Sequence, residues 1–281
     1  MIVTKSIEEV RSFVNEKKKE GLSVGFVPTM GYLHEGHASL LKESKKENDI
    51  TILSIYVNPT QFGPNEDLSS YPRDMERDCK IAEEEGVDLV FTPTDDVLYP
   101  GNYKTYVYVE GLTNTLCGRS RPTHFRGVTT IVTKLFNIVA PHNAYFGQKD
   151  AQQYFVLNRM ATDLNMDICL KSCPIIREED GLAKSSRNVY LNEKERQQAT
   201  ILNKSLNEAV NKVKEGERSS LEIVEGIRST INSMDLANID YVEIVDTETM
   251  QQIDEIKNKV LIAIAVKFGN TRLIDNRILE V

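Results

Sequence analysis

Two of the four histidines lie three positions apart in the stretch VPTMGYLHEGH, residues 27–37. His34 and His37 follow an apolar run and occupy the first turn of the helix that the next residues predict. The unpaired N–H groups and positive dipole of a helix start attract anions, and Gly31 lets the backbone approach a phosphate. Capping or packing of the helix by the histidines is an open alternative. A zinc site is a weaker alternative, because HEGH lacks the H-E-x-x-H spacing and a third ligand.

Polar side chains also follow two other strand-like runs. In YVNPTQFG, Asn58 and Gln61 flank a rigid turn, where their amides could bind a hydroxyl or a carboxylate oxygen; an ordinary turn is the alternative. In FGQKDAQQ, Lys149 offers a point charge to a phosphate and Asp150 is a candidate N-cap of the next helix. Gln152 and Gln153 enter the first turn of that helix, and only one of them can face a pocket.

Three further stretches concentrate charge. GLAKSSRNVYL, residues 181–191, combines lysine, two serines and arginine in a loop that could wrap a triphosphate, with a solvated turn as the alternative. CGRSRPTHFRG, residues 117–127, is compatible with an anion site or an interface. YPRDMERDC offers acidic side chains as contacts for metal or water, although an exposed acidic helix face explains them as well. These acids are Asp74, Glu76 and Asp78.

These segments together predict a nucleoside triphosphate bound by a histidine-bearing helix start and a basic loop. No candidate covalent nucleophile is evident, because there is no G-x-S-x-G motif and the two serines of the GLAKSSRNVYL loop lack a nearby histidine in sequence. Attack on the α-phosphate with departure of pyrophosphate requires alignment and positive charge. Magnesium normally accompanies such phosphates.

The elements that must position these residues alternate between strand and helix over about 175 residues. SIEEVRSFVNEKKKEG begins with a predicted capping box from Ser6 to Glu9, and buried strands are predicted at LSVGFVP, ITILSIYVNP, VDLVF, AYFG and DICLKSCPII. Helices are predicted in the intervening segments. We therefore expect an α/β protein with a Rossmann-like, doubly wound parallel sheet in a domain of residues 1–175. Residues 176–281 predict a smaller α+β lid domain, with charge-dense helices followed by a small mixed sheet.

The overall charge limits the partners. The net charge of −8 argues against nucleic acid as a partner, because such proteins carry a broad basic face. The beginning of the chain does not look like a secretory signal, and the apolar run VLIAIAV is too short to cross a membrane. Four scattered cysteines are typical of reduced thiols, so we expect a cytoplasmic protein.

The motifs resemble a known family. HEGH is similar to the H-x-G-H signature of the nucleotidyltransferase superfamily, and KSSRN is similar to its companion KMSKS-type loop. More narrowly, GFVPTMGYLHEGH, VNPTQFGPNEDLSSYPRD, RPTHFRGV, YFGQKDAQQ and SSRNVYL occur in order and resemble the pantoate–β-alanine ligase family. The resemblance implies an ATP-dependent ligase that condenses pantoate with β-alanine through pantoyl-adenylate, releasing AMP and pyrophosphate. It also implies Mg2+ and a homodimer.

The resemblance also assigns roles to individual residues. Gln61 and Gln153 would bind pantoate, Gln61 would also lie near β-alanine, Asn58 would belong to the active site, and Asp78 would lie near the metal. The catalytic groups implied are His37, which would donate a proton, and His34, Lys149, Ser185, Ser186 and Arg187. The ATP-binding residues implied are Met30, Gly31, His34, His37, Gly147, Gln148, Lys149, Asp150, Ile176, Lys184, Ser185, Ser186 and Arg187.

Two positions depart from the usual family motifs. Members commonly have GEKD and MSSR where this chain has Gln148 and Lys184. Gln148 is expected to make backbone contacts. Lys184 adds a cation to the loop, which would strengthen ATP binding or alter closure of the loop.

Overall fold

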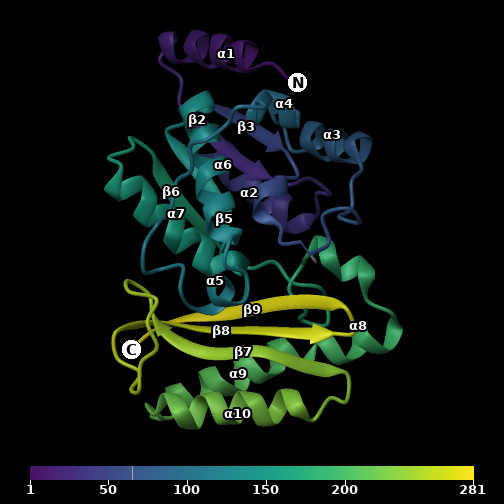
Figure 1. The fold of residues 1–281 in the computed structure, drawn as a ribbon, viewed down its shortest axis with the longest axis vertical. Helices are drawn as coiled ribbons and strands as arrows, with labels where there is room; N and C mark the ends of the chain where they lie inside the picture. The colour runs from purple at the N-terminus through teal and green to yellow at the C-terminus, as the bar shows by residue number, and fades with distance from the viewer. Residues whose placement is uncertain (65) are drawn as a thin grey trace. The chain divides into compact units, whose positions relative to one another are not determined.

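The computed structural model describes residues 1–64 and 66–281, which form two compact units. The first unit contains residues 1–109, 121–148 and 156–174, and the second contains residues 110–120, 149–155 and 175–281. The expected domain division after residue 175 stays a prediction. Figure 1 shows the helices and strands of both units.

The first unit is built on a six-stranded parallel sheet with the order β1-β4-β3-β2-β5-β6. Its strands are β1 Ile2–Thr4, β2 Val24–Thr29, β3 Ile50–Ile55, β4 Leu89–Phe91, β5 Asn143–Gly147 and β6 Cys169–Cys173. Its helices are α1 Ile7–Lys19, α2 Glu35–Glu47, α3 Met75–Glu84, α4 Asp95–Leu98 and α6 His124–Val139, and α7 Ala151–Asp163 begins in the second unit and ends in the first. The predicted Rossmann-like class is confirmed.

Helices cover both faces of this sheet. Successive side chains of β2 point to opposite faces. Val27 belongs to an apolar cluster with Leu40 and Leu41 of α2, whereas Phe26 makes an edge-to-face contact with Phe136 of α6, with ring centroids 6.5 Å apart. This double covering explains why the strands are almost continuously apolar.

The strand order creates a topological switch point between β2 and β5. From β2 the chain moves outward through β3 and β4, and it then returns to the other side of β2 to form β5 and β6. Loops that leave the carboxyl ends of β2 and β5 diverge, which is where open parallel sheets bind ligands.

Two local expectations need correction. Ser6 does cap α1 by accepting from the Glu9 N–H, but the predicted capping box is not closed by Glu9. The Ser6 N–H donates to the Thr4 hydroxyl, which itself donates to the Glu9 carboxylate. Strand β1, which supplies Thr4, was not predicted, because three residues are too short to show an alternating pattern.

The second unit packs helices on a three-stranded sheet. Strands β7 Ala237–Asp246, β8 Lys259–Phe268 and β9 Thr271–Glu280 are antiparallel neighbours in that order, so the expected mixed sheet is wrong. A two-residue turn at Gly269–Asn270 joins β8 to β9, and such a hairpin can only pair antiparallel strands. The helices are α5 Leu116–Ser120, α8 Glu193–Ala199, α9 Ile201–Lys214 and α10 Ser220–Asn232.

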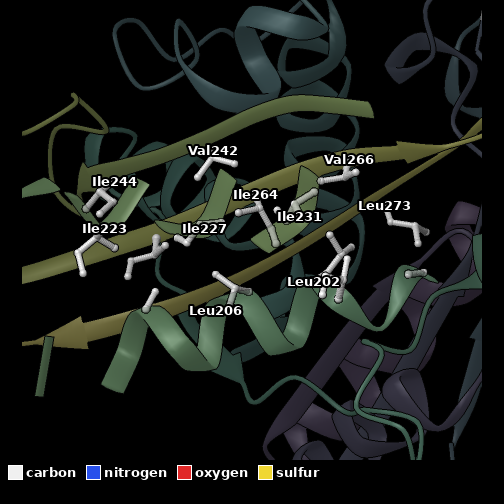
Figure 2. Packing of buried hydrophobic residues seen from close by; sticks show 14 of the residues in the cluster. Leu202, Leu206, Ile223, Ile227, Ile231, Val242, Ile244, Ile264, Val266 and Leu273 are labelled. Atoms are coloured by element: carbon white, nitrogen blue, oxygen red, sulfur yellow. The ribbon is translucent and has the colours of Figure 1, made fainter. Parts of the chain in front are cut away.

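One face of this sheet packs against α9 and α10. Figure 2 shows the apolar cluster, in which leucines of α9 and isoleucines of α10 meet one row of side chains from the strands. The labelled members include Leu202, Leu206, Ile223, Ile227, Ile231, Val242, Ile244, Ile264, Val266 and Leu273. The other face contacts α5, where the Cys117 thiol lies 3.2 Å from the Tyr241 hydroxyl.

Candidate active site

The histidine pair lies at the start of α2, directly beyond the carboxyl end of β2. His34 is the N-cap, and its Nδ1 accepts from the Gly36 N–H at 3.1 Å, while His37 Nδ1 accepts from the His34 N–H at 3.3 Å. The two rings lie close together, with centroids 4.1 Å apart and planes tilted by 39°. The histidines therefore do cap the helix, as one of the sequence interpretations proposed.

This reciprocal cap assigns one task to Nδ1 of each ring. A neutral imidazole has one N–H and one lone pair, and here the lone pair on each Nδ1 accepts from the backbone. Capping and phosphate binding are compatible, because the cap uses a ring acceptor whereas a phosphate requires a ring donor.

The loop before the histidines is held by Asp78 of α3. The Asp78 carboxylate accepts from the Tyr32 N–H at 2.7 Å and from the Leu33 N–H at 2.6 Å, and the residue is only 1% exposed. Gly31 and Tyr32 both have positive φ, of 81° and 51°. Burial raises the pKa of the Asp78 carboxyl above its ordinary value, although both backbone hydrogen bonds favour the ionised form.

This geometry gives Asp78 a clear structural task. Its two oxygens stabilise a loop conformation that non-glycine residues rarely adopt. Asp74 caps α3 by accepting from the Arg77 N–H, and Glu76 is exposed. Among the residues that the structure describes, no group of three or more His, Cys, Asp or Glu side chains is arranged to hold a metal ion.

The turn after β3 brings Asn58 and Gln61 together. Pro59–Gln61 form a 3-10 turn, and Asn58 Nδ2 donates to Gln61 Oε1 at 3.1 Å. Gln61 Nε2 contacts Met30 Sδ at 3.0 Å, so the turn after β3 meets the loop after β2. The first unit thus brings together three predicted site residues from two loops.

Gly147 and Gln148 are the remaining predicted site residues that lie in the first unit. Gly147 is the last residue of β5, which pairs with β2, and Gln148 begins the following 3-10 turn. Both therefore lie on the second branch of the topological switch point. The histidines and these two residues thus lie beyond the carboxyl ends of neighbouring strands.

In the second unit, Gln152 and Gln153 have different surroundings. Gln152 is buried, accepts from the Cys117 N–H at 3.0 Å and donates to the Leu112 and Thr115 carbonyls, both at 2.9 Å. Gln153 is partly exposed. Of the two, Gln153 is the one whose side chain is not committed to this backbone network.

Lys149 and the predicted ATP loop also belong to the second unit. The Lys149 carbonyl accepts from Asn276 Nδ2 at 3.0 Å, and its ammonium lies 3.2 Å from the Asp150 carboxylate. Asp150 ends the 3-10 turn that precedes α7.

The serine-rich loop forms a third 3-10 turn, Ser186–Tyr190. Ser185 caps it by accepting from the Arg187 N–H at 3.3 Å. The Ile176 carbonyl accepts from the Lys184 N–H at 2.9 Å, and Lys184 Nζ lies 2.9 Å from Glu178. The extra cation of this chain is therefore partly neutralised by a neighbouring acid.

The arginines of residues 117–127 each have their own partner. Arg119 pairs with Glu243, Arg121 pairs with Glu66, and Arg126 lies over the Tyr106 ring at 4.5 Å. Burial would raise the pKa of Glu66, but the hydrogen bond and charge of Arg121 hold that pKa below its ordinary value. Each of these arginines therefore has a partner within its own unit.

Sequence reasoning missed one residue of the first unit, Tyr99. Its hydroxyl donates to Asn58 Oδ1 at 2.9 Å, and burial raises the pKa of Tyr99 to about 12. Tyr99 follows α4 and lies 41 positions after Asn58. Only the density of tyrosines at residues 99–108 was visible in the sequence, and it does not indicate a partner.

Comparison with known proteins agrees with this arrangement. The family model of pantoate–β-alanine ligase matches residues 2–278. Curated relatives named pantothenate synthetase include one from Acetivibrio thermocellus, 59% identical over 281 residues and the full length of both chains, and one from Enterococcus faecalis, 57% identical over 276 residues and 98% of each chain.

Solved structures give the same answer. A pantothenate synthetase from Thermus thermophilus has a TM-score of 0.94 and 40% identity over 99% of both chains. A pantoate–β-alanine ligase from Francisella tularensis, complexed with β,γ-ATP and β-alanine, has a TM-score of 0.80 and 34% identity over 99% of this chain and 97% of that one. The chain belongs to the pantoate–β-alanine ligase family.

Proposed function

We propose that this protein is a pantothenate synthetase, which condenses pantoate with β-alanine in an ATP-dependent reaction. The reaction passes through pantoyl-adenylate and releases pyrophosphate and AMP, within the biosynthesis of pantothenate and coenzyme A. The observation that carries the proposal is the His34–His37 capping box at the switch point of a chain of this family.

In the first step a pantoate carboxylate oxygen attacks the α-phosphorus of ATP, and the bond to pyrophosphate breaks. Ring N–H groups of His34 and His37 and the N-terminus of α2 donate hydrogen bonds to the phosphates, and the His37 N–H stabilises the charge that develops on the departing pyrophosphate. The cationic and hydroxyl groups proposed to stabilise the same charge are Lys149, Ser185, Ser186 and Arg187. Other proposed ATP contacts are Met30, Gly31, Gly147, Gln148, Asp150, Ile176 and Lys184.

In the second step the β-alanine amine attacks the acyl carbon of the mixed anhydride, loses a proton and displaces AMP. Gln61 and Gln153 hold pantoate through both steps, and Gln61 also lies beside the amine. The burial of Asn58 and its hydrogen bond to Gln61 support a role for Asn58 in the same site.

Magnesium enters this proposal with the nucleotide. Mg2+ usually binds through one or two carboxylates together with substrate phosphates. Both oxygens of the buried Asp78 accept backbone N–H groups, so Asp78 does not fit a direct metal ligand. The ATP phosphates are the better ligands, and no step above depends on a protein-held ion.

We also propose a cytoplasmic homodimer without nucleic-acid or membrane partners. The acidic net charge supports the absence of a nucleic-acid partner. None of the helices within residues 1–64 and 66–281 is long and apolar enough to span a bilayer.

Isotope exchange between pyrophosphate and ATP tests the reaction. We expect exchange that requires pantoate alone, and AMP release once β-alanine is added. Exchange driven by an amino acid would assign the chain to another kind of adenylating enzyme. Binding of ATP without exchange would make it a sensor, and release of ADP would exclude an adenylate mechanism.

A further inference from the structure

Gln61 is fixed at both its backbone and its side chain by residues of the first unit. Its carbonyl accepts from His124 Nδ1 at 2.9 Å and from Arg121 Nη2 at 3.2 Å. Its side-chain oxygen accepts from Asn58 Nδ2 at 3.1 Å. A long polar side chain held in this way has little freedom to choose which end it shows to a ligand.

The amide of Asn58 is itself oriented by a backbone donor and a backbone acceptor, each of which has only one possible role. Asn58 Oδ1 accepts from the Thr60 N–H at 3.4 Å and from the Tyr99 hydroxyl, while Asn58 Nδ2 donates to the Gly127 carbonyl at 3.1 Å. A backbone N–H can only donate and a carbonyl can only accept. Reversing the amide would therefore place donor against donor and acceptor against acceptor in a site that is 1% exposed.

The orientation passes from Asn58 to Gln61. Because Asn58 presents an N–H to Gln61, the Gln61 oxygen must face Asn58 and its NH2 must face the opposite way. That NH2 now contacts the Met30 sulfur at 3.0 Å. A thioether is a weak acceptor, so an oxygen of a substrate would be a stronger partner for the same group.

We propose that Tyr99 and Asn58 are positioning residues. They fix the Gln61 carboxamide with its NH2 group facing away from Asn58, so that Gln61 acts only as a donor toward an oxygen of the substrate acid. This inference rests on the proposed function and adds the direction of the hydrogen bond. Glutamine can normally donate or accept. The pre-oriented amide favours an oxygen lone pair, such as that of a carboxylate, and spares the cost of ordering the side chain on binding.

Gln61→Glu tests the direction of the hydrogen bond. The variant keeps the shape and can still accept from Asn58, but it offers the substrate lone pairs in place of N–H groups. We expect the KM for pantoate to rise by about 10- to 150-fold, the range for a lost hydrogen bond to a charged group, while the KM for ATP stays within about twofold. A variant that binds pantoate as well as the wild type would show that Gln61 accepts from a substrate hydroxyl, and would overturn the proposal.

Tyr99→Phe tests the positioning role, with Tyr56→Phe as the matched control. The Tyr56 hydroxyl bonds Asp95 at 2.7 Å, and its ring centroid lies 6.5 Å from that of Tyr99. Both variants lose one partly buried, hydrogen-bonded hydroxyl, so we expect similar decreases in Tm. Only Tyr99→Phe should raise the KM for pantoate, by about two- to tenfold, since Thr60 and Gly127 still hold Asn58.

The wild-type assay separates the two levels of inference. If the wild-type protein does not turn over pantoate, the proposed function is wrong. If it does, and either Tyr99→Phe leaves the pantoate KM unchanged or both tyrosine variants raise it equally, the positioning role alone is refuted.

Discussion

Replacing Asp78 by Asn should loosen the loop that carries the histidines. Asp78 accepts two short backbone hydrogen bonds, from Tyr32 and Leu33, in a site that excludes water. An asparagine has one acceptor oxygen and would present its NH2 to the second N–H group. One donor is then unpaired, and both hydrogen bonds lose the charge that strengthens them.

The size of the effect follows from these contacts. Loss of a hydrogen bond to a charged group costs about 1.5–3 kcal/mol, and a buried unpaired N–H adds to that loss. Burial raises the pKa of Asp78 because removing the carboxylate from water is unfavourable, and a neutral Asn avoids part of this desolvation cost. We therefore expect a decrease of about 2–3 kcal/mol in the free energy of unfolding, which lowers Tm by roughly 5–10 °C.

The same change should impair the chemistry. Tyr32 keeps its positive φ only while the surroundings enforce it, and it lies two residues before His34. A displacement of about 1 Å costs on the order of a hundredfold in rate, so pantoate-dependent exchange should fall by about that factor. Asp74→Asn on the same helix is the matched control and should behave as wild type, because Asn is an equally good N-cap.

The assay is a melting curve together with isotope exchange at several magnesium concentrations. Unchanged Tm with a higher magnesium requirement would mean that Asp78 contacts the metal, as the family resemblance implied. That result would refute the positioning argument. Unchanged Tm and unchanged exchange would refute both roles.

Three further changes test other supports. The pKa of Glu66 is lowered by its pair with Arg121, so the wild-type protein should lose stability as pH falls below the ordinary carboxyl range and protonation breaks that pair. In denaturant titrations, Glu66→Gln should lack this part of the acid sensitivity. Gly127→Ala places a Cβ 2.4 Å from the Thr60 carbonyl oxygen, so the KM for pantoate should rise at least tenfold; an unchanged KM would show that the turn is free to shift. Asp275→Asn breaks the buried pair with Arg177, at 2.7 Å, and should cost about 3 kcal/mol in urea unfolding; a loss below 1 kcal/mol would contradict that burial.

Most of the main secondary structure could be predicted because its signals are local. Apolar runs between glycines, prolines and caps predicted strands β2 to β6 of the parallel sheet and the larger helices. The capping role of His34 was also among the sequence interpretations, since a cap acts within one turn. Strand β1 and the antiparallel sheet were missed or misjudged, because strand pairing depends on distant segments and on the type of turn.

The candidate site shows the same difference between local signals and contacts made by distant segments. The motif residues could be named from the sequence, but their supports could not. Asp78 lies 46 positions from Tyr32, Tyr99 lies 41 from Asn58, and His124 lies 63 from Gln61. Acids and tyrosines are common on exposed helices and loops, so their composition does not indicate these contacts.

The sequence by itself determined which segments become strands and helices, where the chemistry-bearing motifs begin, and to which family they are similar. The tertiary structure decided how those motifs are held. It made Nδ1 of each capping histidine the acceptor of a backbone N–H, committed both oxygens of Asp78 to the backbone, and set the Gln61 oxygen against the Asn58 amide. The physical reason is that a hydrogen bond has a direction, and its donor and acceptor are paired only after the fold has brought distant segments within about 3 Å of each other.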